Sequence, residues 1–134
     1  MAKVTVKIEA EIRPTEDAEK VKAAVNNVLG NAQITIEPQH EISLLTATAE
    51  GQDSLVKLRN LLRQDRIRDA SRKLLFKSTR GSKISFYLNK QVAYAGHISF
   101  CEQNAESPLG PIHFTIEVED TRTLVEWLAE KTKE

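Results

Sequence analysis

The sequence has little cysteine, few aromatic residues and no net charge. Cys101 is the only cysteine among 134 residues, so no disulfide within the chain and no cysteine-based zinc site can form. A single thiol suits a reducing compartment, and we expect a cytoplasmic protein. Aromatic residues make up 5% of the chain, so aliphatic side chains must fill most of the core. A chain of this length is typical of one domain, and we expect residues 1–134 to form one.

Signatures of membrane insertion, metal binding and catalysis are also missing from the sequence. No apolar run approaches the roughly 20 residues that span a bilayer, and the first residues alternate in polarity, unlike a signal peptide. The three histidines show no spacing typical of a metal site. No nucleophile elbow, Walker loop or dinucleotide-binding glycine motif occurs. We therefore expect no membrane segment, no metal, no cofactor and no enzymatic activity.

Alternating polarity predicts a sheet with one buried face. Polar and apolar residues alternate strictly over residues 3–13, which is typical of strands in antiparallel sheets. Other segments show helical spacing or further alternation, and Asp120 is suited to cap a C-terminal helix. The expected order is β-α-β-β-α-α-β-β-β-α. This order predicts an α+β fold, with a mainly antiparallel sheet and helices packed on one face.

The region after residue 54 predicts two helices rather than one. The apolar residues Leu62 and Ile67 are five positions apart, which breaks the spacing of a continuous helical stripe. We expect the two helices to meet near Gln64–Asp65, with Ile67, Ala70 and Leu74 as the apolar stripe of the second.

Residues 84–100 predict two strands joined by a turn at Asn89–Lys90. A two-residue turn would place Tyr87 and Tyr94 on one face as diagonal neighbours. If exposed, the two rings could stack on unpaired bases. If packed beneath a helix, they would be ordinary core residues with bonded hydroxyl groups.

The positive charge of the chain is concentrated in residues 57–83. This stretch contains ten Lys or Arg and two acids, a net charge of +8, whereas the rest contains nine basic and 17 acidic residues, a net charge of −8. Guanidinium groups bind phosphate with two hydrogen bonds, and such a cluster attracts a nucleic-acid backbone. The alternative is a solvated helical surface whose charge is neutralised by Asp65, Asp69 or the acidic remainder of the chain.

We predict an RNA-binding surface built from this basic stretch and from the turn that follows it. Arg59, Arg63 and Arg66 share a face if the first helix extends that far. Arg68 and Arg72, four positions apart, share a face of the second helix. The complete set of candidate residues is Arg59, Arg63, Arg66, Arg68, Arg72, Lys73, Lys77, Arg80, Lys83, Asn89, Lys90 and Gln91.

Three motifs, LLRQDRIRDASRKLL, FYLNKQVAYAGHISF and SPLGPI, occur in this order. Together they resemble an archaeal family of predicted RNA-binding, exosome-subunit-like proteins, and the similarity covers nearly the whole chain. The resemblance implies a fold like that of the fifth protein of the large ribosomal subunit and a role in RNA processing. It implies no catalytic residue. The positions that it implies for RNA contact are Arg63, Arg66, Arg68 and Arg72 in the first motif and Asn89, Lys90 and Gln91 in the second.

Two functions are compatible with the sequence, and a third, weaker possibility is an enzyme whose dispersed acidic residues converge in space. The leading hypothesis is a non-catalytic RNA-binding protein, an accessory factor in RNA processing or degradation whose partners are RNA and an RNA-processing complex. The alternative is a protein-interaction module or a homo-oligomer such as a homodimer. In that case the basic surface would meet an acidic surface of another copy, such as Glu117, Glu119 and Asp120.

Overall fold

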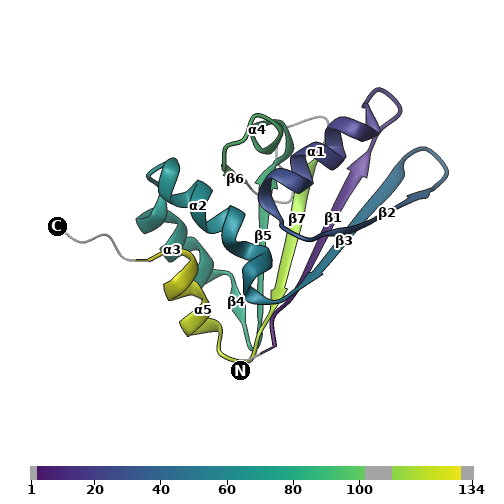
Figure 1. The fold of residues 1–134 in the computed structure, drawn as a ribbon. Coiled ribbons are helices and arrows are strands. Elements are labelled where there is room, and N and C mark those ends of the chain that lie inside the picture. Colours follow the sequence, from purple (N-terminus) through teal and green to yellow (C-terminus); the bar gives the residue numbers. More distant parts are fainter. Residues whose placement is uncertain (1–2, 102–109, 131–134) are drawn as a thin grey trace.

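The computed structural model describes residues 3–101 and 110–130, which form both strands and helices (Figure 1). The strands are β1 (Thr5–Ile12), β2 (Gln33–Pro38), β3 (Ser43–Glu50), β4 (Thr79–Arg80), β5 (Lys83–Asn89), β6 (Phe100–Cys101) and β7 (Pro111–Glu117). The helices are α1 (Ala18–Val28), α2 (Val56–Gln64), α3 (Arg68–Lys77), α4 (Lys90–Tyr94) and α5 (Thr121–Leu128), with a short 3-10 helix at Gln52–Leu55.

The strands of the described residues form one sheet in the order β2-β3-β1-β7-β5-β4, with β6 paired to β5. Every strand pair is antiparallel. The helices lie on one side of the sheet, with α2, α3 and α5 grouped together and α1 and α4 beside them (Figure 1). The predicted α+β class is confirmed, as are the mainly antiparallel sheet and the helices on one face.

The core lies between the sheet and the helices. The alternation predicted for residues 3–13 is confirmed, because Val4, Val6, Ile8, Ala10 and Ile12 are all buried. On the neighbouring central strands the ring of Phe86 stacks on that of Phe114, with the centroids 4.9 Å apart. Removing one such buried side chain from water contributes about 1.5 to 3 kcal/mol, so the inner sheet face anchors the fold.

Two local predictions are confirmed at the helix ends. Helix α2 ends at Gln64 and Asp65 is its C-terminal cap, so the basic stretch forms two helices that meet at the predicted position. Asp120 caps α5, where its carboxylate accepts hydrogen bonds from the Thr123 backbone N–H at 3.1 Å and from the Thr123 hydroxyl at 2.7 Å. These hydrogen bonds lower the pKa of Asp120.

The predicted hairpin at Asn89–Lys90 is wrong. Asn89 ends β5 and its side-chain oxygen accepts a hydrogen bond from the Val92 N–H at 3.0 Å, which starts helix α4 in place of a turn. The chain returns to the sheet only in the two-residue strand β6. Tyr87 therefore lies on β5, whereas Tyr94 lies on α4 and is 47% exposed. In the SPLGPI motif, residues 107–109 lie outside the described part of the chain.

Candidate nucleic-acid interface

The corner between α2 and α3 presents three arginines. The Arg66 N–H bonds to the Arg63 carbonyl and the Ile67 N–H to the Leu62 carbonyl, both at 3.2 Å, so the chain reverses in a Schellman motif. This motif places Arg66 in the left-handed region, with φ of 58°. Glycine usually occupies that position because a Cβ atom makes the conformation unfavourable. Arg66 is thus outside the helix, and the predicted continuous face Arg59–Arg63–Arg66 is wrong.

Arg63, Arg66 and Arg68 nevertheless come together in space. With Asp69 they line a shallow pocket of about 340 Å³ at the corner. Arg63 and Arg66 are exposed and Arg68 is half-buried. The Asp69 carboxylate reduces the mutual repulsion of the three guanidinium groups, and the four side chains together keep a net positive charge.

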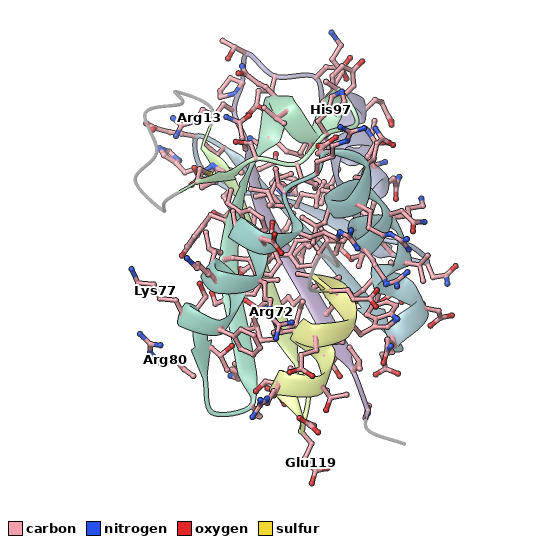
Figure 2. The ribbon with its side chains drawn as sticks, turned by 90° about the vertical axis from the view of Figure 1, so that its left-hand side faces the viewer. Arg13, Arg72, Lys77, Arg80, His97 and Glu119 are labelled. Atoms are coloured by element: carbon pink, nitrogen blue, oxygen red, sulfur yellow. The ribbon has the colours of Figure 1, made fainter. Side chains whose placement is uncertain are left out.

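The outer side of α3 continues the positive surface. Lys73 and Lys77 are four residues apart on the helix, and both are exposed. Nη1 of Arg80 donates to the carbonyl oxygens of Lys77 and Thr79 at 3.0 Å, which fixes the guanidinium at the C-terminal end of the helix. Figure 2 shows Lys77 and Arg80 projecting from this edge of the molecule.

Two predicted RNA contacts, Arg59 and Arg72, instead hold α5 against the other helices. Nε of Arg59 donates to the Trp127 carbonyl at 3.0 Å and its guanidinium lies 3.4 Å from the Glu130 carboxylate. The Arg72 guanidinium lies 3.5 Å from the Glu126 carboxylate. Both arginine side chains are about three-quarters buried, with exposed fractions of 23% and 26%. Arg72 accordingly lies between α3 and α5 in Figure 2, whereas Lys77 projects outward.

Lys90, a third predicted contact, is buried. Its Nζ donates to the Glu11 carbonyl oxygen at 2.7 Å and to both carboxylate oxygens of Glu16 at 3.1 and 3.2 Å. Burial lowers the pKa of Lys90, and the hydrogen bond and charge of Glu16 oppose this shift. Asn89 is occupied as the cap of α4, and the exposed Gln91 is the one residue of the three that is open to solvent.

The Asp65 carboxylate links the basic corner to the segment that follows α4. One of its oxygens lies 3.0 Å from Nδ1 of His97, and the other accepts the Ile98 N–H at 2.9 Å. Partial burial favours the neutral acid, but these hydrogen bonds outweigh it and lower the pKa of Asp65. The carboxylate therefore stays charged at neutral pH and keeps the corner in place.

Among the described residues no helix covers the other face of the sheet, which carries both glutamates and basic side chains. Lys83, the last basic candidate, lies on this face at β5 and its Nζ is 3.8 Å from the Glu117 carboxylate. The strands β1, β2, β3 and β7 contribute five glutamates to the same face and one lysine, Lys7. These glutamates are Glu9, Glu11, Glu37, Glu50 and Glu117. Three of the five are in ion pairs, Glu11 with Arg13, Glu50 with Lys3 and Glu117 with Lys83, so the open face carries only a small excess of negative charge.

A serine, a histidine and a glutamate meet on the open face, an arrangement that no sequence motif indicates. Ser85 Oγ lies 2.8 Å from Nε2 of His113, but Nδ1 of that ring lies 4.0 Å from the Glu9 carboxylate, too far for a hydrogen bond. The Tyr87 ring stacks on the imidazole, with the centroids 4.4 Å apart. Among the described residues the group therefore forms a polar ladder across three strands, with Glu9 outside hydrogen-bond distance of the imidazole.

A family model described as RNA binding matches residues 5–118. The chain belongs to this RNA-binding family. A UPF0201 protein of Sulfolobus acidocaldarius is 46% identical over 125 residues, which cover 93% of this chain and 86% of that protein. A UPF0201 protein of Metallosphaera sedula is 41% identical, covering 93% of this chain and 87% of that protein. Both relatives are archaeal.

Solved structures of related proteins share the fold. The crystal structure of a UPF0201 protein from Methanococcus jannaschii has a TM-score of 0.85 and 34% sequence identity, and covers 96% of this chain and 95% of its own. A DUF54 protein from Methanothermobacter thermautotrophicus has a TM-score of 0.62 at 20% identity, covering 94% and 97% of the two chains. The latter shows the fold alone.

The RNA-binding family is described by a ligand and not by a reaction. Among residues 3–101 and 110–130, no three His, Cys, Asp or Glu side chains form a group that could hold a metal ion. No helix in the same residues is long and apolar enough to cross a membrane. Cytoplasmic location stays a prediction.

Proposed function

We propose that this member of the RNA-binding family binds RNA through a basic surface, which comprises Arg63, Arg66, Arg68, Lys73 and Lys77. In the described part of the chain none of these five residues forms an ion pair with a carboxylate. This observation carries the proposal, because cations without a carboxylate partner can neutralise RNA phosphates and so release the counterions condensed on the RNA. From Arg68 to Lys77 along α3 the surface extends about 13.5 Å at the helical rise of about 1.5 Å per residue.

The conformation of Arg66 supports the proposal. An arginine in the left-handed region costs about 1 kcal/mol relative to glycine, and such strain is often found at functional positions. The side chain therefore contributes something that glycine could not provide, and at a cationic corner a phosphate contact accounts for it. We further propose that the protein acts without catalysis, as an accessory factor in a complex for RNA processing or degradation, in the cytoplasm.

Salt dependence tests the proposed function. Fluorescence anisotropy would be measured with a labelled single-stranded RNA and a labelled RNA duplex between about 50 and 300 mM salt, where phosphate contacts are most sensitive. If all five cations contact phosphates, log affinity should fall linearly with log salt, with a slope of about −3.5 on single strands at about −0.7 per contact. Absence of binding at the lowest salt would refute the proposal.

Arg66→Gly should separate the function of Arg66 from its effect on stability. Glycine relieves the positive φ, so we expect the free energy of unfolding to rise by about 0.5 to 1 kcal/mol. The loss of one phosphate contact should weaken RNA binding about 4-fold at physiological salt. Urea unfolding and anisotropy measure the two effects.

Asn31→Gly is the matched control, since Asn31 is the other described non-glycine residue with positive φ, at 55°. Asn31→Gly should leave RNA affinity unchanged. It should raise the free energy of unfolding by less than Arg66→Gly does, because asparagine tolerates this conformation better than arginine. Equal RNA affinity in Arg66→Gly and the parent would remove Arg66 from the interface.

The glutamates of the open face favour a second function, self-association. A basic helical side on one copy could meet the glutamates of β1, β3 and β7 on another, and such a contact would weaken with salt. Light scattering of the RNA-free protein across the same salt series distinguishes the two functions. A mass that doubles at low salt supports self-association, and a monomer at every salt concentration argues against it.

A further inference from the structure

An aromatic ring lies exposed beside the basic surface. Phe76, in the last turn of α3, is 38% exposed, and among the described residues Val56 and Tyr94 are the other large apolar side chains exposed to this degree. A single exposed apolar side chain is common and carries no meaning alone. Its neighbours therefore decide what the ring can bind.

The neighbours of Phe76 are cations. The Arg72 guanidinium lies over the ring, 5.2 Å from its centroid, and the Glu126 carboxylate at 3.5 Å holds that guanidinium in place. Lys73 lies one turn before Phe76, and Lys77 follows it directly. Arg80 is bound to the Lys77 carbonyl, so its charge stays at the same end of the helix.

We infer that Phe76 is a stacking site for an unpaired nucleobase of the RNA bound at the basic surface. This inference rests on the proposed function and narrows it to single-stranded RNA. A free base can stack on an aromatic side chain while adjacent phosphates meet nearby lysines, whereas bases within a duplex have no accessible face. Lys73, Lys77 and Arg80 are positioned to take those phosphates.

The surroundings favour a nucleobase over an apolar protein partner. Apolar protein interfaces have a desolvated apolar centre with charged residues depleted from it. Phe76 has instead three exposed cations near it and Arg72 on its ring. Removing these charges from water against an apolar partner would cost more free energy than burial of the ring contributes. RNA phosphates would instead form charged hydrogen bonds with each of the cations.

Phe76→Leu is the decisive variant, because leucine keeps the apolar character and the helix but removes the π face. In Phe76→Leu the affinity for a single-stranded RNA should fall about 10-fold, whereas Phe76→Trp should bind this RNA as tightly as the parent protein. The salt slope should stay the same in Phe76→Leu, since no charge is removed, and duplex affinity should not change. An RNA that carries 2-aminopurine reports the stacking itself, with fluorescence quenched by the parent protein and not by Phe76→Leu.

The possible outcomes separate the two claims. If the parent protein binds RNA and Phe76→Leu binds single strands equally well, the stacking site is refuted while the proposed function stands. A ring that instead binds a protein partner would give this same result. If the parent protein binds no RNA at any salt, both claims fail.

Discussion

Reversing three charges of the basic surface, in Arg63→Glu/Arg66→Glu/Lys73→Glu, should lower affinity for single-stranded RNA by about 100-fold at physiological salt. Each phosphate contact contributes about 0.6 log unit at about 0.15 M salt, so three lost contacts account for roughly 50-fold, and repulsion by the new carboxylates adds to it. The magnitude of the salt slope should fall by about 2. Anisotropy across the salt series measures both.

The choice of these three positions matters. All three side chains are free of ion pairs among the described residues, so reversing them should leave the circular dichroism and the unfolding midpoint nearly unchanged. Arg72 is left out because its ion pair with Glu126 holds α5 against α3, and a change there would confuse lost binding with lost structure.

A control with the same change in net charge is available at three lysines outside α2 and α3. Lys3, Lys7 and Lys20 are exposed on the open sheet face and on α1, away from the basic surface. Lys3→Glu/Lys7→Glu/Lys20→Glu should reduce affinity only slightly, through long-range electrostatics that salt screens. If both triple variants lose affinity equally, the RNA does not bind at the α2–α3 corner.

The parts of the fold that were predictable depend on neighbours in sequence. The alternation at β1, the break between Leu62 and Ile67 and the capping of α5 by Asp120 all involve residues within five positions of one another. The apolar stripe predicted for the second helix is confirmed at Ile67 and Leu74, which pack partly buried against the core, and is wrong at Ala70, which is exposed. The fully buried residues of α3 are Ser71 and Leu75, because the contacts with α5 and β5 set the rotation of the helix.

The prediction of a hairpin at Asn89–Lys90 was wrong for a reason that lies in the local sequence. A short apolar run such as residues 92–95 fits a strand and one helical turn equally well, and the Asn89 cap decided for the helix.

The candidate site was predictable as a region and not as a set of residues. Charge along the sequence located the basic stretch, but ion pairs made by distant residues decide which cations are free. Arg59 meets Glu130, 71 positions away, and Lys90 meets the Glu11 carbonyl, 79 positions away. Neither partner is visible from local spacing, so both residues looked like surface cations. Phe76 was missed for the same reason, since its exposure depends on how α3 packs.

The buried pair of Lys90 and Glu16 gives the largest expected effect on stability. Lys90→Met should lower the free energy of unfolding by about 3 kcal/mol or more, because removing one partner leaves a buried charge uncompensated. The side chains of Lys90 and Glu16 are 5% and 7% exposed, and the lysine ties α4 to β1 and to the start of α1. Urea unfolding followed by circular dichroism measures the loss.

A second substitution tests whether the unpaired carboxylate is the cause. In Lys90→Met/Glu16→Gln the neutral amide can still accept the Arg13 N–H, which Glu16 accepts at 2.9 Å, so part of the lost stability should return. Folded Lys90→Met should bind RNA within about 2-fold of the parent, since a buried side chain makes no phosphate contact. If Lys90→Met unfolds like the parent and binds RNA tenfold more weakly, Lys90 belongs to the RNA interface as the sequence suggested, and the buried pair has no structural role.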